Sequence, residues 1–369
     1  MFYKYAKSQT HNKLIQKEIH TMNIKYTPIL RWKTGERKCL ENLSPEISSQ
    51  IIPFIEVAPP TVSSTTTDES AYEKKFKKLI SSFNISWEDK LFYLYLSASW
   101  YADVYNPDEY FDIYRNLFTL IHHPGAIPAF DINDEINISH AASLENTNGI
   151  CLRIRVNDFE SISQTLQDYI DNLWIIPEET DLLLDLTYID DEIYPKKAAL
   201  TTAISDIPNL SNYRRIIIAS CSFPKDISNL TSNCISERKR AELAIHQISL
   251  NLQRNFTFNY VYADYGPMNL NETPYIIGMS PTFKIKYSTE EKYLIYKGLP
   301  LKKGGLDLIN IVTACKQLIN HPLYSGKSFS YGDGIIDSIA NGTNSKGGNL
   351  TNWVEYSFNH HITLIVSLM

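Results

Sequence analysis

Glycine is scarce in this sequence, with 14 residues among 369, and no predicted strand is followed by a Gly-x-Gly-x-x-Gly turn. The glycine-rich turn by which dinucleotide-binding sheets approach a pyrophosphate is therefore excluded. The five cysteines are scattered and include no Cys-x-x-Cys pair, which is typical of free thiols in a reducing compartment. There is no run of 18 apolar residues and no signal-peptide pattern. We therefore expect a cytoplasmic protein that does not enter a membrane.

Positive charge is not in excess either. The chain has 35 basic and 41 acidic residues, which gives a formal net charge of −6. This balance provides no general attraction to nucleic acid or to anionic membranes, so neither is indicated as a partner. The first twenty residues are polar and without periodicity. We therefore interpret residues 1–21 as an N-terminal extension and residues 22–369 as a single domain.

Short apolar runs alternate with helical patterns along the chain. Alternation of this kind predicts parallel β/α units, and eight of them predict a (β/α)₈ barrel. A doubly wound open α/β sheet would produce the same local pattern and is the alternative, although the missing glycine-rich turn disfavours it. The predicted strands cover residues 26–32, 51–57, 91–97, 126–132, 150–156, 181–187, 215–222 and 256–264, and the predicted helices cover 35–49, 68–83, 107–122, 133–146, 158–172, 195–207 and 236–254.

The regular alternation pauses after the eighth predicted strand. Residues 283–297 alternate apolar and polar side chains around a Ser-Thr-Glu-Glu turn, which predicts a β-hairpin. We expect the eighth barrel helix at 306–320, followed by a C-terminal elaboration over 325–369 that ends in a strand-like run at 362–368. Loops from strand to helix emerge at the catalytic end of such barrels. The hairpin should therefore cover the barrel mouth.

The fifth predicted strand contains two arginines, Arg153 and Arg155, on one face. Buried arginines require acids or an anionic ligand as partners. Several ionisable or polar residues lie near the ends of other predicted strands and should meet the arginines at the carboxyl end: Lys33, Glu56, Asp131, Asp185, Asp264 and Tyr265. We predict Glu56, Asp185 and Asp131 as catalytic carboxylates and the other residues as ligand-binding. The alternative is a structural ion network that fills the upper layer of the barrel.

Further candidates lie in the C-terminal part of the sequence. Lys302 and Lys303 precede Gly304 and Gly305 before a predicted helix, a pattern that suits a phosphate, although a solvated loop is the alternative. Of the pair His360 and His361, we expect His360 to reach the site. Adjacent residues on a strand face opposite sides, so we do not predict that the pair binds zinc. The acids could hold Mg²⁺, but the arginines compete for them, and we assign no metal and no cofactor.

Several motifs resemble those of a bacterial family described only as beta family proteins. They lie at 26–36 (YTPILRWKTGE), 52–57 (IPFIEV), 151–155 (CLRIR), 222–224 (SFP), 264–266 (DYG), 293–298 (YLIYKG), 330–333 (SYGD), 348–353 (GNLTNW) and 359–362 (NHHI). The resemblance extends from Tyr26 to the C-terminus. It implies no particular activity. It does imply an association with variable, prophage-related loci, and from this a role in phage defence or mobile-element biology.

Two functions are consistent with these observations. The first is a barrel hydrolase that acts by general acid–base chemistry on a phosphorylated or glycosidic substrate and binds an anionic small molecule. The second is a non-enzymatic sensor or partner-binding subunit of a defence system, whose partner is encoded in the same locus. An open mouth with converging acids favours the enzyme. A mouth closed by the hairpin and the tail favours the binding module.

Overall fold

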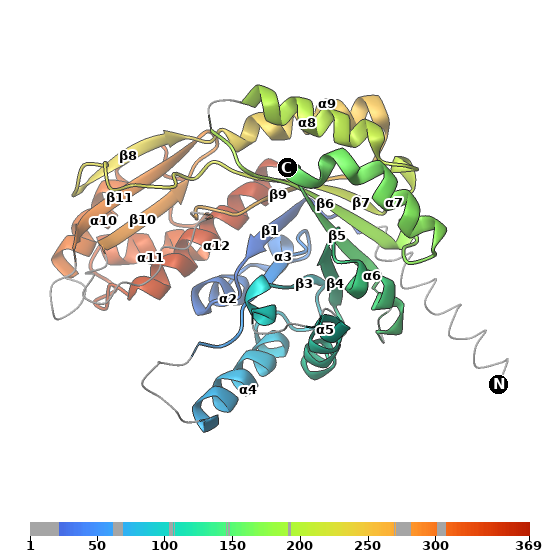
Figure 1. Ribbon diagram of the computed structural model, residues 1–369. Coiled ribbons are helices and arrows are strands. Elements are labelled where there is room, and N and C mark those ends of the chain that lie inside the picture. The colour runs from blue at the N-terminus through green and yellow to red at the C-terminus, as the bar shows by residue number, and fades with distance from the viewer. Residues whose placement is uncertain are drawn as a thin grey trace.

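The computed structural model describes residues 22–61, 69–102, 106, 108–144, 146, 148–190, 193–268, 270, 282–300 and 308–369. Eight strands of this part of the chain are parallel and close into a barrel (Figure 1). The barrel closes where the last strand pairs with the first, with Tyr262 beside Tyr26. The strands are β1 (Tyr26–Leu30), β2 (Phe54–Val57), β3 (Phe92–Leu96), β4 (Ala126–Asp131), β5 (Ile150–Arg155), β6 (Thr180–Tyr188), β7 (Arg215–Cys221) and β9 (Tyr260–Asp264). The predicted (β/α)₈ barrel is confirmed, and the open sheet is excluded.

Helices follow the barrel strands in the order that the sequence pattern predicts. They are α2 (Thr34–Glu41), α3 (Pro45–Ser48), α4 (Glu69–Ser86), α5 (Asp108–Ile121), α6 (Glu135–His140), α7 (Ile162–Asp171), α8 (Ile193–Asp206) and α9 (Glu242–Phe256). Short 3₁₀ helices add to them at Ala98–Tyr101, Ala141–Ser143, Val156–Ser161, Pro177–Glu179 and Leu210–Asn212. Local sequence signals set several starts. The Ser44 hydroxyl accepts a hydrogen bond from the backbone N–H of Ile47, and Pro45 occupies the first helical position of α3.

A small antiparallel sheet stands beside the barrel, with strand order β10–β11–β8 (Figure 1). The predicted hairpin is confirmed and consists of β10 (Thr282–Ser288) and β11 (Lys292–Pro300). The third strand, β8 (Cys234–Lys239), corrects the prediction of a helix over 236–254, because α9 begins only at Glu242. The hydrogen-bond partner of β8 is β11, more than fifty residues further along the chain. Such a distant pairing leaves no local signal.

The three C-terminal helices are α10 (Leu308–Ile319), α11 (Tyr331–Ala340) and α12 (Leu350–Leu368). The predicted helix at 306–320 exists as α10, but it covers the small sheet together with α11 instead of the barrel. The eighth barrel helix is α12, which packs against α2, β1 and β10. The predicted strand at 362–368 is therefore wrong. Phe358, Ile362 and Ile365 follow a helical spacing and are buried against the barrel wall.

The barrel interior is polar at both ends and apolar between them. Near the amino end, Asp181 binds the guanidinium groups of Arg214 and Arg215. Middle positions such as Leu183 and Ile217 belong to one buried apolar cluster. Other members of that cluster lie outside the barrel strands and belong to the carboxyl-end connections: Phe223, Leu230, Tyr293 and Ile295. The small sheet therefore covers part of the carboxyl end, on the side of β7 and β9.

Candidate active site at the carboxyl end of the barrel

The most buried charges of the mouth surround Arg153 on β5. Its Nε and Nη2 atoms donate to Oδ2 of Asp185 at 3.0 and 2.7 Å, and its Nη1 donates to Oε1 of Glu56 at 2.6 Å. Nη2 also lies 2.7 Å from the hydroxyl of Tyr265, which donates to Asp185 at 2.6 Å. Burial opposes the charge of Arg153, but Tyr265, Asp185 and Glu56 together raise its pKa well above the ordinary value. Arg153 is therefore a permanent cation that already has its counter-ions.

Arg155 forms a second group nearer to solvent. Its Nη1 donates to Oδ1 of Asp131 at 2.5 Å, and its Nη2 donates to the hydroxyl of Tyr95 at 3.1 Å. That hydroxyl donates to Oδ2 of Asp131 at 2.7 Å. Burial, followed by the charge of Asp131, raises the pKa of Tyr95 to about 12, so the hydroxyl keeps its proton at neutral pH. The side chain of Arg155 is 37% exposed, compared with 5% for Arg153.

The two groups together hold two cations and three carboxylates, and each guanidinium is bound to at least one carboxylate. An anionic ligand would have to displace one of these acids to reach Arg153, whereas Arg155 is partly exposed. Arg153 therefore orients the carboxylates more readily than it binds an incoming anion.

A hydrogen bond from a strained backbone position helps to hold Asp185 in place. Thr187 follows it by two residues, has a φ of +58°, and donates its backbone N–H to Oδ1 of Asp185 at 2.9 Å. A β-branched residue in the left-handed region costs on the order of 1–3 kcal/mol and persists only where surrounding contacts enforce it. Asp185 is completely buried, and both of its oxygens accept hydrogen bonds. Its position is therefore fixed before any ligand arrives.

A cavity of about 280 Å³ borders the exposed side of this site, between the ends of β3 and β4 and helix α5. Tyr95 and Asp131 contribute to its wall, together with Tyr101 and Tyr110. Aromatic walls with a few converging polar groups are typical of small-molecule sites. This side of the mouth therefore has the features of a small-molecule site.

Asp264 lies at the carboxyl end of β9, but its side chain points away from the two arginines. It accepts hydrogen bonds from the hydroxyls of Tyr26 and Tyr262 at 2.5 and 3.0 Å, and Nε2 of His361 lies 3.0 Å away. Burial alone would raise the pKa of this carboxyl group, but His361, Arg240 and Tyr26 hold it well below its ordinary value. Asp264 thus binds the barrel wall to α12 and does not join the Arg153 group.

His361 continues this buried network to the small sheet, because its Nδ1 lies 2.7 Å from Oγ of Ser288. Ser288, His361 and Asp264 thus form a line of serine, histidine and aspartate. None of the three is more than 1% exposed, so no substrate can reach the hydroxyl. The line is structural and connects β10, α12 and β9.

His360 does not reach the mouth. Its Nδ1 lies 2.8 Å from Oδ2 of Asp333, its Nε2 lies 2.7 Å from the carbonyl oxygen of Ser288, and its ring stacks on Tyr287. His360 and His361 lie on a helix, so the assumption of a strand was wrong, yet the two rings contact different carboxylates. Among the described residues, no group of three or more His, Cys, Asp or Glu side chains is arranged to hold a metal ion.

Of the predicted ligand-binding lysines, Lys33 is exposed at the start of α2, where its backbone N–H donates to Glu36. Lys302 and Lys303 lie outside the described residues. Tyr95 was not predicted from the sequence, although the alternation in β3 places it on the same face as Tyr93. Lys284 and Lys286 were not predicted either, although they alternate with the apolar residues of β10.

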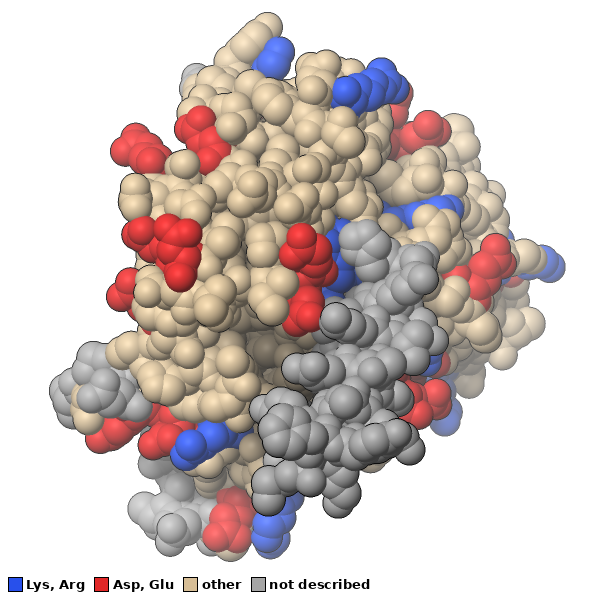
Figure 2. All heavy atoms as spheres, turned by 90° about the vertical axis from the view of Figure 1, so that its right-hand side faces the viewer, with Lys and Arg blue, Asp and Glu red and all other residues tan. Residues whose placement is uncertain are grey.

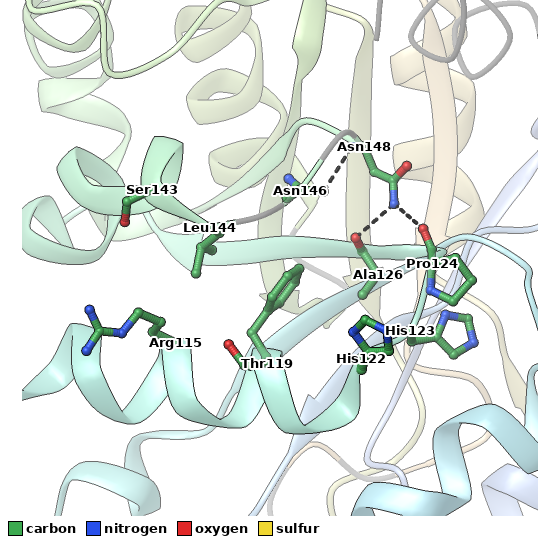
Figure 3. Close-up of a pocket in the computed structure, with 11 residues that line it drawn as sticks. Arg115, Thr119, His122, His123, Pro124, Ala126, Ser143, Leu144, Asn146 and Asn148 are labelled. Atoms are coloured by element: carbon green, nitrogen blue, oxygen red, sulfur yellow. Dashed lines mark hydrogen bonds between the residues drawn. The ribbon is translucent and has the colours of Figure 1, made fainter. Parts of the chain in front are cut away.

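A separate cavity of about 670 Å³ lies toward the amino end of the barrel, between α5 and the connection from β4 to β5 (Figure 3). Two of its polar side chains already have partners. Asn148 donates to the carbonyl oxygens of Pro124 and Ala126, as the dashed lines show, and Arg115 binds Asp112 on its own helix. Polar residues at this end of (β/α)₈ barrels generally serve stability. We therefore place the candidate site at the carboxyl end.

On the face shown in Figure 2, basic and acidic side chains are interspersed and most of the visible surface is neither. Within the described residues, no helix combines the length and the apolar character that crossing a membrane requires.

Comparisons with known proteins give one strong result. No curated protein matches the chain in sequence. Among solved structures, D-psicose 3-epimerase from Clostridium cellulolyticum H10, crystallised with D-tagatose, aligns with 65% of this chain and 84% of its own, at 10% identity and a TM-score of 0.25. A TM-score this low supports no conclusion about function, and the barrel itself is evident from the strand pairing. The family model described as Beta protein matches residues 26–367. The chain therefore belongs to the Beta protein family.

Proposed function

We propose that the protein is a hydrolase that acts on a glycosidic substrate, with Glu56 and Asp131 as its two working carboxylates. Glycoside hydrolysis generally uses a pair of carboxyl groups, one to protonate the leaving oxygen and one to act as a base or nucleophile. Asp185, which the sequence also suggested as catalytic, is completely buried and has hydrogen bonds to both oxygens. We therefore assign it a positioning role toward Arg153.

One observation carries the proposal. Glu56 and Asp131 are the carboxylates of the arginine groups that reach solvent, with side chains that are 21% and 30% exposed. Each has one oxygen held by an arginine, so its orientation is fixed at the open half of the mouth. The tyrosine-lined cavity beside Asp131 provides room for a ring-shaped ligand.

The contacts suggest how the two roles divide. Both oxygens of Asp131 accept hydrogen bonds from donors, Arg155 and Tyr95, an arrangement that suits a base or nucleophile. Glu56 has Arg153 as its single partner among the described residues, through Oε1. Oε2 of Glu56 is then the oxygen left to meet the leaving group of a substrate, so we assign the acid role to Glu56. Each role contributes roughly 10²–10⁴-fold to the rate in well-studied enzymes.

The test is hydrolysis of a panel of chromogenic aryl glycosides, with and without a phosphate on the sugar. We expect Glu56→Gln and Asp131→Asn each to lower kcat/KM by at least roughly a hundredfold. Asp112→Asn is the matched control, because Asp112 is an exposed carboxylate that also pairs with an arginine. Full activity in both site variants would contradict the proposal, as would a wild-type protein that hydrolyses no member of the panel.

The alternative, a sensor or partner-binding subunit of a phage-defence or mobile-element system, is supported by the partial cover over the mouth. Phe223, Tyr293 and Ile295 pack with residues of the barrel interior in one buried cluster. Phage plaque counts on cells that express the protein with its neighbouring genes separate the two proposals. A hydrolase should lose protection in the Glu56→Gln and Asp131→Asn variants, whereas a binding module should keep it.

A further inference from the structure

The two faces of the small sheet have opposite characters. Phe283, Ile285 and Tyr287 of β10 are buried against α10, α11 and α12. Side chains alternate along a strand, so Lys284 and Lys286 project from the other face. Lys286 pairs with Ile295 on β11, and Ile295 belongs to the buried cluster of the barrel interior. This lysine face is therefore turned toward the barrel mouth.

Lys286 is a half-buried cation with an aromatic ring as its nearest identified partner. Its Nζ lies 5.0 Å from the ring centre of Phe223, which is itself buried at the mouth. Neither Lys286 nor Lys284 forms a hydrogen bond or an ion pair with any residue that the structure describes. Burial, followed by the charge of Lys284, lowers the pKa of Lys286 to about 8, although the charge of Glu36 acts in the opposite direction. Burial and the charge of Lys297 likewise lower the pKa of Lys284, against the charge of Asp226.

A buried ammonium group that no carboxylate contacts directly is unfavourable, and a second one beside it makes the arrangement worse. The arginines of the mouth do not share this property, because acids neutralise both of them. We propose that Lys286 and Lys284 bind the phosphate group of a ligand that enters the barrel mouth. This inference rests on the proposed function, because it identifies the substrate of the same mouth as a phosphorylated one.

Phosphate fits this pair better than a carboxylate does. A phosphate monoester is close to a dianion at neutral pH and matches two ammonium groups, whereas a carboxylate would leave one of them unpaired. Lysine binds phosphate as a compact point charge. The position agrees with a general feature of (β/α)₈ enzymes, which often bind phosphate with the loops after the seventh and eighth strands. Here Phe223 follows the seventh barrel strand, and β10 follows the eighth.

The experiment measures phosphate binding by calorimetry and by thermal unfolding, at constant ionic strength, with inorganic phosphate, a hexose phosphate, the free hexose and acetate as probes. We expect both phosphates to bind and to raise Tm, while the free hexose binds more weakly than its phosphate. Lys286→Met and Lys284→Met should each weaken phosphate binding roughly tenfold or more. Lys292→Met is the matched control, because Lys292 lies on the same sheet, is exposed and pairs with Glu237.

A second readout guards against a merely structural effect. In wild-type protein with isotope-labelled lysine side chains, Lys286 should titrate near pH 8 and shift to a higher value when phosphate is added. An unchanged titration, equal losses in Lys292→Met, or acetate binding as tight as phosphate would each overturn the proposal. These measurements involve no turnover. Phosphate binding without any hydrolysis would therefore contradict the hydrolase and leave the phosphate site in place.

Discussion

Replacement of Asp185 by Ala removes the carboxylate that holds the most buried guanidinium group of the barrel mouth. Oδ2 of Asp185 accepts three hydrogen bonds, two from Arg153 and one from Tyr265, and its Oδ1 accepts one from the backbone of Thr187. The Arg153 side chain is 5% exposed, so water cannot replace these contacts. Removal of one partner of a buried ion pair generally costs about 3–5 kcal/mol. We expect a loss within this range. It should not exceed the range, because Glu56 still balances part of the charge of Arg153.

Urea unfolding at neutral pH measures this loss directly. A loss of about 3–5 kcal/mol is a large part of the 5–15 kcal/mol that typically stabilises a domain. Asp185→Asn should lose less, because the amide keeps an acceptor for Arg153. Asp112→Ala is the control and should cost no more than about 1 kcal/mol, since its pair with Arg115 is exposed. A loss below about 1 kcal/mol in Asp185→Ala would refute the view that this group is a fixed scaffold.

Three further predictions follow from the same contacts. Arg155→Ala should cost about 1 kcal/mol or less in urea unfolding, because its side chain is 37% exposed. A loss as large as that of Asp185→Ala would contradict the view that Arg155 is stabilised less by its ion pair than the more deeply buried Arg153. The pKa of Asp264 is lowered by folding, so its stabilising contribution is present above the unfolded value of about 4 and is lost as the pH falls further. The Asp264→Asn variant should therefore lose less stability than wild type between pH 5 and pH 2, and parallel curves would contradict the assignment. The pKa of Lys286 is also lowered, to about 8, so wild type should gain stability relative to Lys286→Met as the pH rises from about 8 to about 10.5. A constant difference would show that the ammonium group is hydrated.

The barrel was predictable because each of its strands pairs with a neighbour only one β/α unit away. The ion-pair partners of Arg153 were partly predictable for the same reason. Arg155 lies beside Asp185 in the register of β5 and β6, so Arg153, Arg155 and Asp185 share the inward face. The side of the barrel wall to which the Asp264 side chain points was not predictable. Both faces of a parallel strand are buried, so the pattern Tyr-Val-Tyr-Ala-Asp does not reveal which side points inward.

The C-terminal part was harder to predict because its contacts are distant in sequence. α12 serves as the eighth barrel helix, although β10, β11, α10 and α11 separate it from β9. Its residues Ile362 to Leu368 are apolar enough to resemble a strand. The helix becomes evident only from the packing of Phe358 and Ile362 on the barrel wall. The lysine face of β10 could have been predicted, because lysines alternate with apolar residues in the sequence of this strand. What the sequence could not provide was the position of that face above the mouth, since Phe223 lies some sixty residues away.

We propose that Glu56 and Asp131 perform acid–base chemistry on a phosphorylated, glycosidic ligand at the carboxyl end of the barrel. The most direct measurement incubates wild type, Glu56→Gln, Asp131→Asn and Asp112→Asn with a metabolite extract and follows all sugar phosphates by mass spectrometry. We expect one phosphorylated glycoside to disappear with wild type and with Asp112→Asn, and to persist with Glu56→Gln and Asp131→Asn. Equal metabolite profiles for all four proteins would contradict it.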